Sequence, residues 1–473
     1  MLVVRRFGPV VLVAVLALAA FALPVNAQPA NLPTWTVGQA VGYGTNLDLT
    51  SLMAPLLLQL QSNPAAFNIT SIQELNFTGS LDVWVHDEVV SQTDTYYVLQ
   101  SESANGLKIH VAVNVTFNNL PAPGTYSGSC TYGFFDGAIP AVTRSVEVDM
   151  DLTSLSTTSG TARYAVSDLA LMEETSNATD QVSGRAILRG VPMIDLNLTL
   201  CQETVTYDDQ DLTIAVNMNN EYRVLFSPAL DYFDFPINPS EDWWVYSNAT
   251  VGATLSGTIN VDGLDAADEA AFFDSLASAF QSISGLAITG LDHFPIDLAQ
   301  ITVTVGGTNV LQGGLLRDMV VPVAERLQAR EANMTLADGD LHPVMLLSAY
   351  QDPLAGCPPT LYAVYSVDDG MIVGLELYPT CEPTGLAIFE LRPVPADTAQ
   401  EKIGNTERNY AVVPTPAGNP VADFFFAAPY WGLLLVILAI AIIALLLLRR
   451  RGRPTIMSPP APPMPPPPPP SPP

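Results

Sequence analysis

The sequence predicts a mainly β fold with minor α content, built from curved antiparallel sheets or half-barrels and followed by one C-terminal transmembrane helix. Three observations support this prediction. Apolar residues alternate with polar ones along most of the chain. Short polar or glycine-bearing links separate the alternating segments. An uninterrupted apolar run of 22 residues occupies 427–448, which is long enough to cross about 30 Å of hydrocarbon.

Residues 1–27 have the pattern of a secretory signal peptide. Two arginines precede an apolar stretch over residues 10–23, and Pro24 follows that stretch. The small residues that end the segment suit a signal peptidase, so we expect cleavage after Ala27. The alternative is an uncleaved second anchor, but the apolar stretch is short for a membrane span.

The apolar run at 427–448 predicts a single transmembrane helix, because a helix satisfies all its backbone hydrogen bonds within lipid. The run contains no charged residue, and four arginines follow it closely: Arg449, Arg450, Arg451 and Arg453. Basic flanks stay on the cytoplasmic side of a membrane. We therefore expect a single-pass protein of the cell membrane with its ectodomain outside and its C-terminus in the cytoplasm.

The predicted ectodomain is strongly acidic. Outside the signal peptide and the arginine cluster, 12 basic residues face 47 acidic ones, which is a net charge of −35. Phosphate recognition requires clustered basic charge. This balance excludes nucleic acid as a partner and indicates a surface adapted to a salty medium.

Ten segments alternate apolar with polar residues, as half-buried antiparallel strands do. They cover residues 80–85, 95–100, 107–117, 145–152, 161–171, 182–188, 195–205, 212–217, 222–226 and 253–261. Links at residues 104–106, 158–160 and 207–210 are typical of hairpins. Two helices are expected at residues 52–61 and 265–284, the second with one apolar stripe.

A sequence pattern that occurs twice in the ectodomain predicts two related β-rich modules. Trp35 followed by residues 77–83 is matched by Trp243 followed by residues 255–261. A third segment is rich in proline, polar and small residues without periodicity, which is typical of a stalk. The expected division is 28–225 for the first module, 226–391 for the second module with its helix, 392–426 for the stalk, 427–448 for the membrane helix and 449–473 for the cytoplasmic segment.

The aromatic segment 226–244, FSPALDYFDFPINPSEDWW, resembles a signature of exported β-rich domains in the lipoprotein-carrier half-barrel family. The likeness covers only this short segment. It implies a curved antiparallel sheet wrapped around a helix, with a concave face that holds acyl chains. We expect Phe233, Phe235, Trp243 and Trp244 to fill the core rather than to contact a ligand.

Four cysteines lie between the signal peptide and the anchor: Cys130, Cys201, Cys357 and Cys381. An even count outside the cell favours two disulfides, although four cysteines permit three pairings. We favour Cys130–Cys201 and Cys357–Cys381, because the second pair brackets a hairpin with its turn at residues 368–370.

Seven Asn-x-Ser/Thr triplets without proline predict glycosylation sites in the ectodomain. They begin at Asn68, Asn76, Asn114, Asn177, Asn197, Asn248 and Asn333.

One stretch has part of the spacing of a calcium loop. Asn260, Asp262 and Glu269 would occupy its third, fifth and twelfth positions. Thr258 stands where a carboxylate is needed, and Asp265 stands where an apolar residue normally lies. We therefore prefer the interpretation of a strand end followed by an acid-capped helix, and we expect no bound metal.

Enzyme motifs are absent from the sequence. The four histidines, His86, His110, His293 and His342, are dispersed, and there is no HExxH, nucleophile elbow, P-loop or dinucleotide fingerprint. Catalysis is not favoured and no cofactor is expected. A carboxylate pair of the glycosidase kind has no sequence spacing, so a carboxylate-dependent hydrolase stays open as an alternative.

The proline-rich end at residues 458–473 predicts an extended polyproline rod, either a solvated tail or a ligand for a cytoplasmic partner. For the whole chain we expect a membrane-anchored surface protein whose β-rich ectodomain binds an extracellular or lipid-like ligand. The other alternative is a structural component of the cell envelope without a small-molecule ligand.

Overall fold

The computed structural model describes residues 29–412, apart from 132–133, 136, 198–199, 208, 240, 265–268, 271–272, 274–285, 291, 306, 351–357, 381–382 and 384–386. This part of the chain is mainly β, as the alternating pattern predicts. The long strands are β2 (Ile69–Gln92), β3 (Tyr96–Pro121), β7 (Ala141–Ala165), β8 (Leu171–Arg189), β11 (Gln210–Leu230), β12 (Asp242–Asp262) and β17 (Leu315–Thr335).

The remaining elements are shorter. The other strands are β1 (Ala40–Asp48), β4 (Gly124–Ser127), β5 (Cys130–Thr131), β6 (Phe134–Phe135), β9 (Met193–Asn197), β10 (Gln202–Thr206), β13 (Leu286–Thr289), β14 (Ile296–Asp297), β15 (Thr302–Val305), β16 (Thr308–Gln312), β18 (Leu341–Ala349), β19 (Thr360–Ser366), β20 (Met371–Tyr378) and β21 (Phe389–Val394). The helical elements are α2 (Leu49–Ser62), η1 (Pro64–Phe67), η2 (Leu298–Gln300) and α4 (Ala396–Tyr410).

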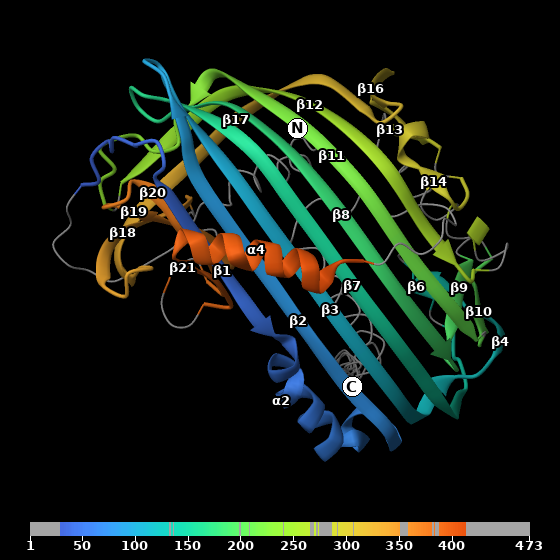
Figure 1. Ribbon diagram of the computed structural model, residues 1–473. Coiled ribbons are helices and arrows are strands. Elements are labelled where there is room, and N and C mark those ends of the chain that lie inside the picture. The colour runs from blue at the N-terminus through green and yellow to red at the C-terminus, as the bar shows by residue number, and fades with distance from the viewer. Residues whose placement is uncertain are drawn as a thin grey trace, which may run out of the picture. The chain divides into compact units, whose positions relative to one another are not determined.

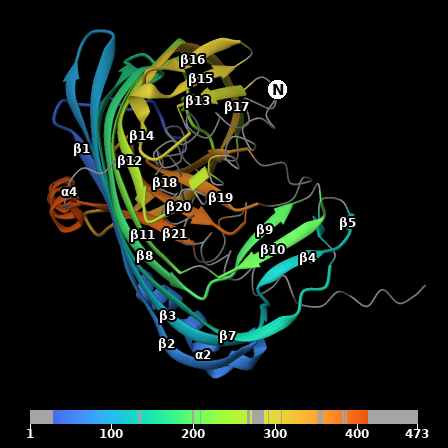
Figure 2. The same ribbon diagram turned by 90° about the vertical axis from the view of Figure 1, so that its right-hand side faces the viewer.

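Antiparallel pairing joins 12 strands into one closed sheet. The order is β17-β18-β19-β20-β21-β1-β2-β3-β7-β8-β11-β12, and β12 pairs back onto β17. The long strands form a curved wall, and the short strands β18 to β21 lie on its concave side (Figure 2). The short strands therefore cover only part of the concave face of the long strands.

This closed sheet crosses the expected module boundary. Residue 226 lies within β11, which pairs with β8 on one side and β12 on the other. The described strands of the two expected modules thus belong to one sheet, because the long strands before and after the boundary pair over most of their length.

Two predicted hairpin links are wrong. Residues 104–106 lie inside β3 and residues 158–160 lie inside β7, with unbroken register between the two strands at both places. Serine, threonine, asparagine and glycine favour turns, but here they have other roles. Asn105 and Thr158 are polar positions on the inner face, and Gly106 permits close packing of Tyr410 on the outer face. The link at residues 368–370 does join β19 to β20, and Gly370 adopts a left-handed φ of 67° there.

The first predicted helix is confirmed, and the predicted stalk needs correction. α2 covers residues 52–61, and the Asp48 carboxylate caps it by accepting a hydrogen bond from Thr50 N at 2.9 Å. α4 occupies the segment expected to be an aperiodic stalk, and it buries Ala399, Ile403 and Tyr410 at helical spacing. Most of the second predicted helix, 265–284, lies outside the described residues.

α4 packs across β1, β2, β3 and β7 on the face opposite the short strands (Figure 1). A Cβ at Gly42 would lie 2.5 Å from the Ala399 Cβ, so only glycine permits this close approach. Ile403 packs on Trp84 and Ala104, and the Tyr410 hydroxyl hydrogen-bonds Ser80 Oγ at 2.9 Å. We call this face of the sheet the outer face.

The opposite, inner face carries the main core. Buried residues of the long strands, such as Tyr97 and Val224, pack there with Val364 and Tyr365 of β19 and with Leu346 of β18. A second core lies where β13 to β16 meet β11 and β12. No helix of the described part could span a membrane, and the predicted span at 427–448 lies outside that part.

Candidate functional site

Cross-strand register aligns polar side chains on the inner face of the long strands. Alternate residues of a strand share one face, so the unbroken pairing places these residues on the same face as Tyr97. Three adjacent rows form what we call the polar belt. Its polar members are Asp87, Ser101, Ser176 and Tyr222, then Ser103, Thr158 and Asn220, then Asn105, Ser156 and Asp180. The same three rows also contain Gly160, Val85, Ala178, Val83 and Met218.

Buried carboxyl groups lie in and beside the polar belt. Burial raises the pKa of Asp87, although hydrogen bonds from Ser101 and Tyr43 oppose the shift. Burial likewise raises the pKa of Asp180 and of Glu174, whose Oε1 accepts a hydrogen bond from the Tyr222 hydroxyl at 2.7 Å. These carboxyls can therefore hold a proton and donate a hydrogen bond over a wider pH range than exposed ones.

The next four rows of the same face are mainly apolar, and we call them the apolar wall. Their apolar members are Leu81, Leu107, Val182 and Val216, then Ile109, Leu152 and Ile214, then Phe77, Val111, Met150, Ala186 and Leu212, then Leu75, Val113, Val148 and Leu188. The same rows also contain Ser154, Gly79, Gly184 and Gln210. Most apolar members of the first two rows are buried, whereas in the last two rows Phe77 and Gln210 are buried and the other residues are only partly buried. The inner face thus changes from polar to apolar along the strands, and apolar surface remains accessible at its far end.

Sequence analysis does not predict this arrangement. It predicts the wall segments as strands, but it places Asn105 and Thr158 of the belt in turns, because serine, threonine, asparagine and glycine favour turns. The signal that could have found the belt is its continuation of the two-residue period of the flanking wall segments.

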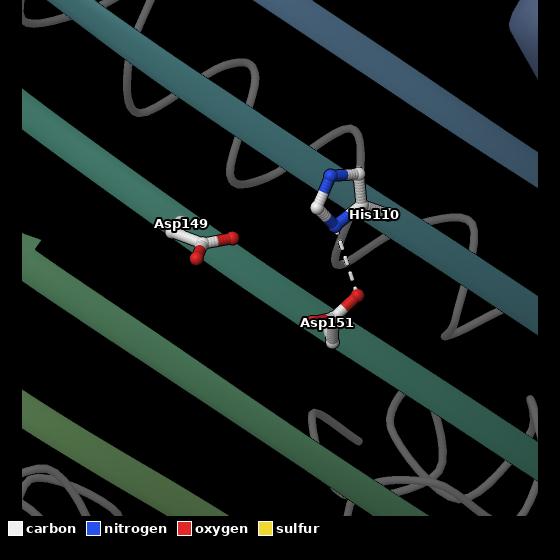
Figure 3. Close-up of side chains that lie close together, drawn as sticks. All are labelled: His110, Asp149 and Asp151. Atoms are coloured by element: carbon white, nitrogen blue, oxygen red, sulfur yellow. Dashed lines mark hydrogen bonds and ion pairs between the residues drawn. The ribbon is translucent and has the colours of Figure 1, made fainter.

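The outer face brings together one histidine and two aspartates (Figure 3). His110 lies on β3, and Asp151 is its direct partner on β7. The His110 Nδ1 and Asp151 Oδ1 atoms are 2.9 Å apart, and Asp149 lies two residues away on the same face of β7. One ligand atom from each residue lies within 4.8 Å of the others. Imidazole and carboxylate are ligands for several divalent metals.

A cation lies beside this cluster. Arg185 of β8 is the cross-strand partner of Asp151, and its guanidinium donates two hydrogen bonds to Asp211. Those hydrogen bonds and the Asp211 charge, with smaller contributions from Asp149 and Asp151, raise the pKa of Arg185. His110, Asp151 and Arg185 thus form a charge ladder across three strands, in which Arg185 offsets part of the negative charge of Asp149, Asp151 and Asp211.

The calcium-loop candidates make hydrogen bonds within the protein. Asn260 Nδ2 donates to Asp262 Oδ2 at 2.7 Å, and Glu269 Oε1 accepts a hydrogen bond from Phe294 N at 2.5 Å. Asp265 lies outside the described residues. The interpretation of a strand end followed by an acid-capped helix and the absence of calcium both stay predictions.

The predicted disulfides stay predictions. Cys357 and Cys381 lie outside the described residues, as does the side chain of Cys130. The backbone does bring the first pair of segments together, because Gly128 N donates a hydrogen bond to Cys201 O at 3.0 Å and β4 pairs with β10.

Glycosylation also stays a prediction, and the placement of the triplets is compatible with it. Asn76, Asn177 and Asn248 are exposed, Asn114 is half-buried, and all four lie on outer-face positions of their strands. The remaining candidates are Asn68 after η1, Asn333 on β17 and Asn197, whose side chain lies outside the described set.

The aromatic segment divides between core and surface. Phe233 and Trp243 are buried in the main core and Phe235 packs against it, as predicted. Trp244 is 55% exposed, so its prediction as a core residue is wrong. Its ring lies nearly parallel to that of Tyr246, 5.7 Å away, because residues two apart on a strand share a face. Asn248 is the next residue of that outer row.

No protein-family model, curated protein or solved structure matches this chain.

Proposed function

We propose that the protein is a single-pass, membrane-anchored surface protein whose inner face binds an amphipathic, lipid-like ligand. One observation carries the proposal: the inner face divides into a polar belt and a partly accessible apolar wall on the same five strands, β2, β3, β7, β8 and β11. Acyl chains gain free energy by covering the wall, about 25 cal/mol for each Å² of apolar surface buried. A polar headgroup finds hydroxyl, amide and carboxyl partners in the belt.

The belt also limits the chemistry of the headgroup. Its charged groups are carboxyls. Arg163, Arg185 and Arg223 of the same strands lie on the outer face in salt bridges. A headgroup with hydrogen-bond donors or a positive charge fits such a belt better than a phosphate monoester does.

The membrane anchorage in this proposal comes from the sequence alone. It is supported by the apolar run at 427–448 and the arginines after it. The same anchor would suit a purely structural envelope component, and the ligand experiment separates the two.

The ligand proposal is tested by extracting lipids from the purified full-length protein and identifying them by mass spectrometry. Leu212 and Thr213 are neighbours on β11, the first on the apolar wall and the second exposed on the outer face. We expect a stoichiometric lipid in the wild type and in Thr213→Asp, and a several-fold loss in folded Leu212→Asp. Equal lipid content in both variants, or none in the wild type, would contradict a ligand on the wall.

A further inference from the structure

α2 presents an apolar surface that the described elements do not cover. Its sequence, LTSLMAPLLLQLQS, has no charged residue, although the chain contains 47 acidic ones. Leu52 and Leu58 are 68% and 63% exposed, and Leu56 is 37% exposed. Leucines this exposed on one short helix are unusual in a protein with such an acidic surface.

α2 begins at the edge of the apolar wall. β1 ends at Asp48, which pairs with Ser80, so β2 loses this partner toward its beginning. α2 continues the chain there: the Thr50 hydroxyl accepts a hydrogen bond from Gly79 N at 3.0 Å, and Leu49 packs at Gly79. Gly79 shares the inner-face row of Ile109, which belongs to the wall. The helix therefore begins beside the wall, and Figure 1 shows it next to the end of β1 and the start of β2.

The predicted membrane helix, which lies beyond the described residues, would hold the protein close to a lipid bilayer. Fourteen residues, 413–426, separate Val412 from the predicted membrane helix. An extended chain spans at most about 3.3 to 3.6 Å per residue, so this linker keeps Val412 within about 50 Å of the bilayer. α2 has no carboxylate to be repelled by lipid headgroups, and burial of exposed leucines in the bilayer interface is favourable.

We propose that α2 inserts its leucines into the outer surface of the bilayer that anchors the protein. This rests on the membrane anchorage in the proposed function. In this position the helix joins the bilayer to the apolar wall, so a lipid could pass between them along an apolar surface.

The test uses full-length protein reconstituted into phosphatidylcholine vesicles and a carbene-generating probe dissolved in the lipid. Labelled peptides are located by mass spectrometry. We expect residues 49–62 to be labelled well above Leu341 on β18 and Val320 on β17. These two residues are 69% and 62% exposed, and they serve as apolar controls away from α2. Leu52→Gln combined with Leu56→Gln and Leu58→Gln should reduce labelling of α2 several-fold. These residues are exposed, so the variant should fold, and an unchanged circular dichroism spectrum would confirm this.

Three outcomes would overturn the inference or separate it from the proposed function. Labelling of α2 no higher than at the two controls overturns it. Self-association that the triple variant abolishes, with α2 unlabelled, assigns the surface to a second copy of the chain and also overturns it. Protein that fails to float with the vesicles refutes the proposed anchorage itself, whereas floating protein with an unlabelled α2 refutes only the inference.

Discussion

Glu376 is a buried carboxyl whose ionisation should lower the stability of the fold. It lies on β20, is 7% exposed, and its Oε2 accepts a hydrogen bond from the Tyr378 hydroxyl at 2.8 Å. Burial raises its pKa from 4.5 to about 7, with a further rise from Glu390, whereas the Tyr378 hydrogen bond and Arg392 act in the opposite direction. We predict that Glu376→Gln stabilises the protein at alkaline pH.

The sign follows from the two states of the protein. The unfolded carboxyl loses its proton near pH 4.5, but the folded one keeps it until about pH 7. Between these values the folded state binds more protons, so stability falls by about 1.4 kcal/mol for each pH unit and the loss is complete above pH 7. With an allowance for solvent screening, the loss is about 2 to 3 kcal/mol. Glutamine resembles the protonated form and does not titrate.

Urea unfolding of the full-length protein in detergent, followed by circular dichroism at pH 4 and pH 8, measures this effect. The free energy of unfolding of Glu376→Gln relative to wild type should increase by about 2 to 3 kcal/mol between the two pH values. Glu407→Gln, at an exposed position of α4, is the matched control and should show no such increase. A difference between Glu376→Gln and wild type that is the same at both pH values would refute the reasoning.

Three further predictions concern the outer face. Gly42→Val should push α4 off the sheet and cost about 1 to 3 kcal/mol in urea unfolding, with faster amide exchange in α4, whereas Gly404→Ala within α4 should be neutral or stabilising. Arg185→Gln should tighten zinc binding at the histidine and aspartate cluster about tenfold by calorimetry, because it removes the competing cation; unchanged affinity would contradict the charge ladder. In a host that glycosylates Asn248, the first sugar should pack on the exposed Tyr246 ring, so Tyr246→Ala should lower the melting temperature of the glycosylated form more than that of the unglycosylated form.

The sequence by itself determined the β-rich class, the first helix and several of the strand segments, but not where the long strands begin and end. Period-two alternation is a local consequence of a strand with one buried face, so 107–117 and 212–217 could be identified without knowledge of their partners. The Asp48 cap and the leucines after it are equally local signals of a helix.

Tertiary structure decided the features that depend on distant partners. Closure of the sheet rests on pairing between β12 and β17, and no local pattern specifies which strands pair. α4 has only a narrow apolar stripe, and it is held by glycines and aromatic residues more than 280 positions away in the chain, such as Gly42 and Trp84. The polar belt and the apolar wall likewise appear only when register places residues of five strands in common rows, since each strand contributes one residue to a row.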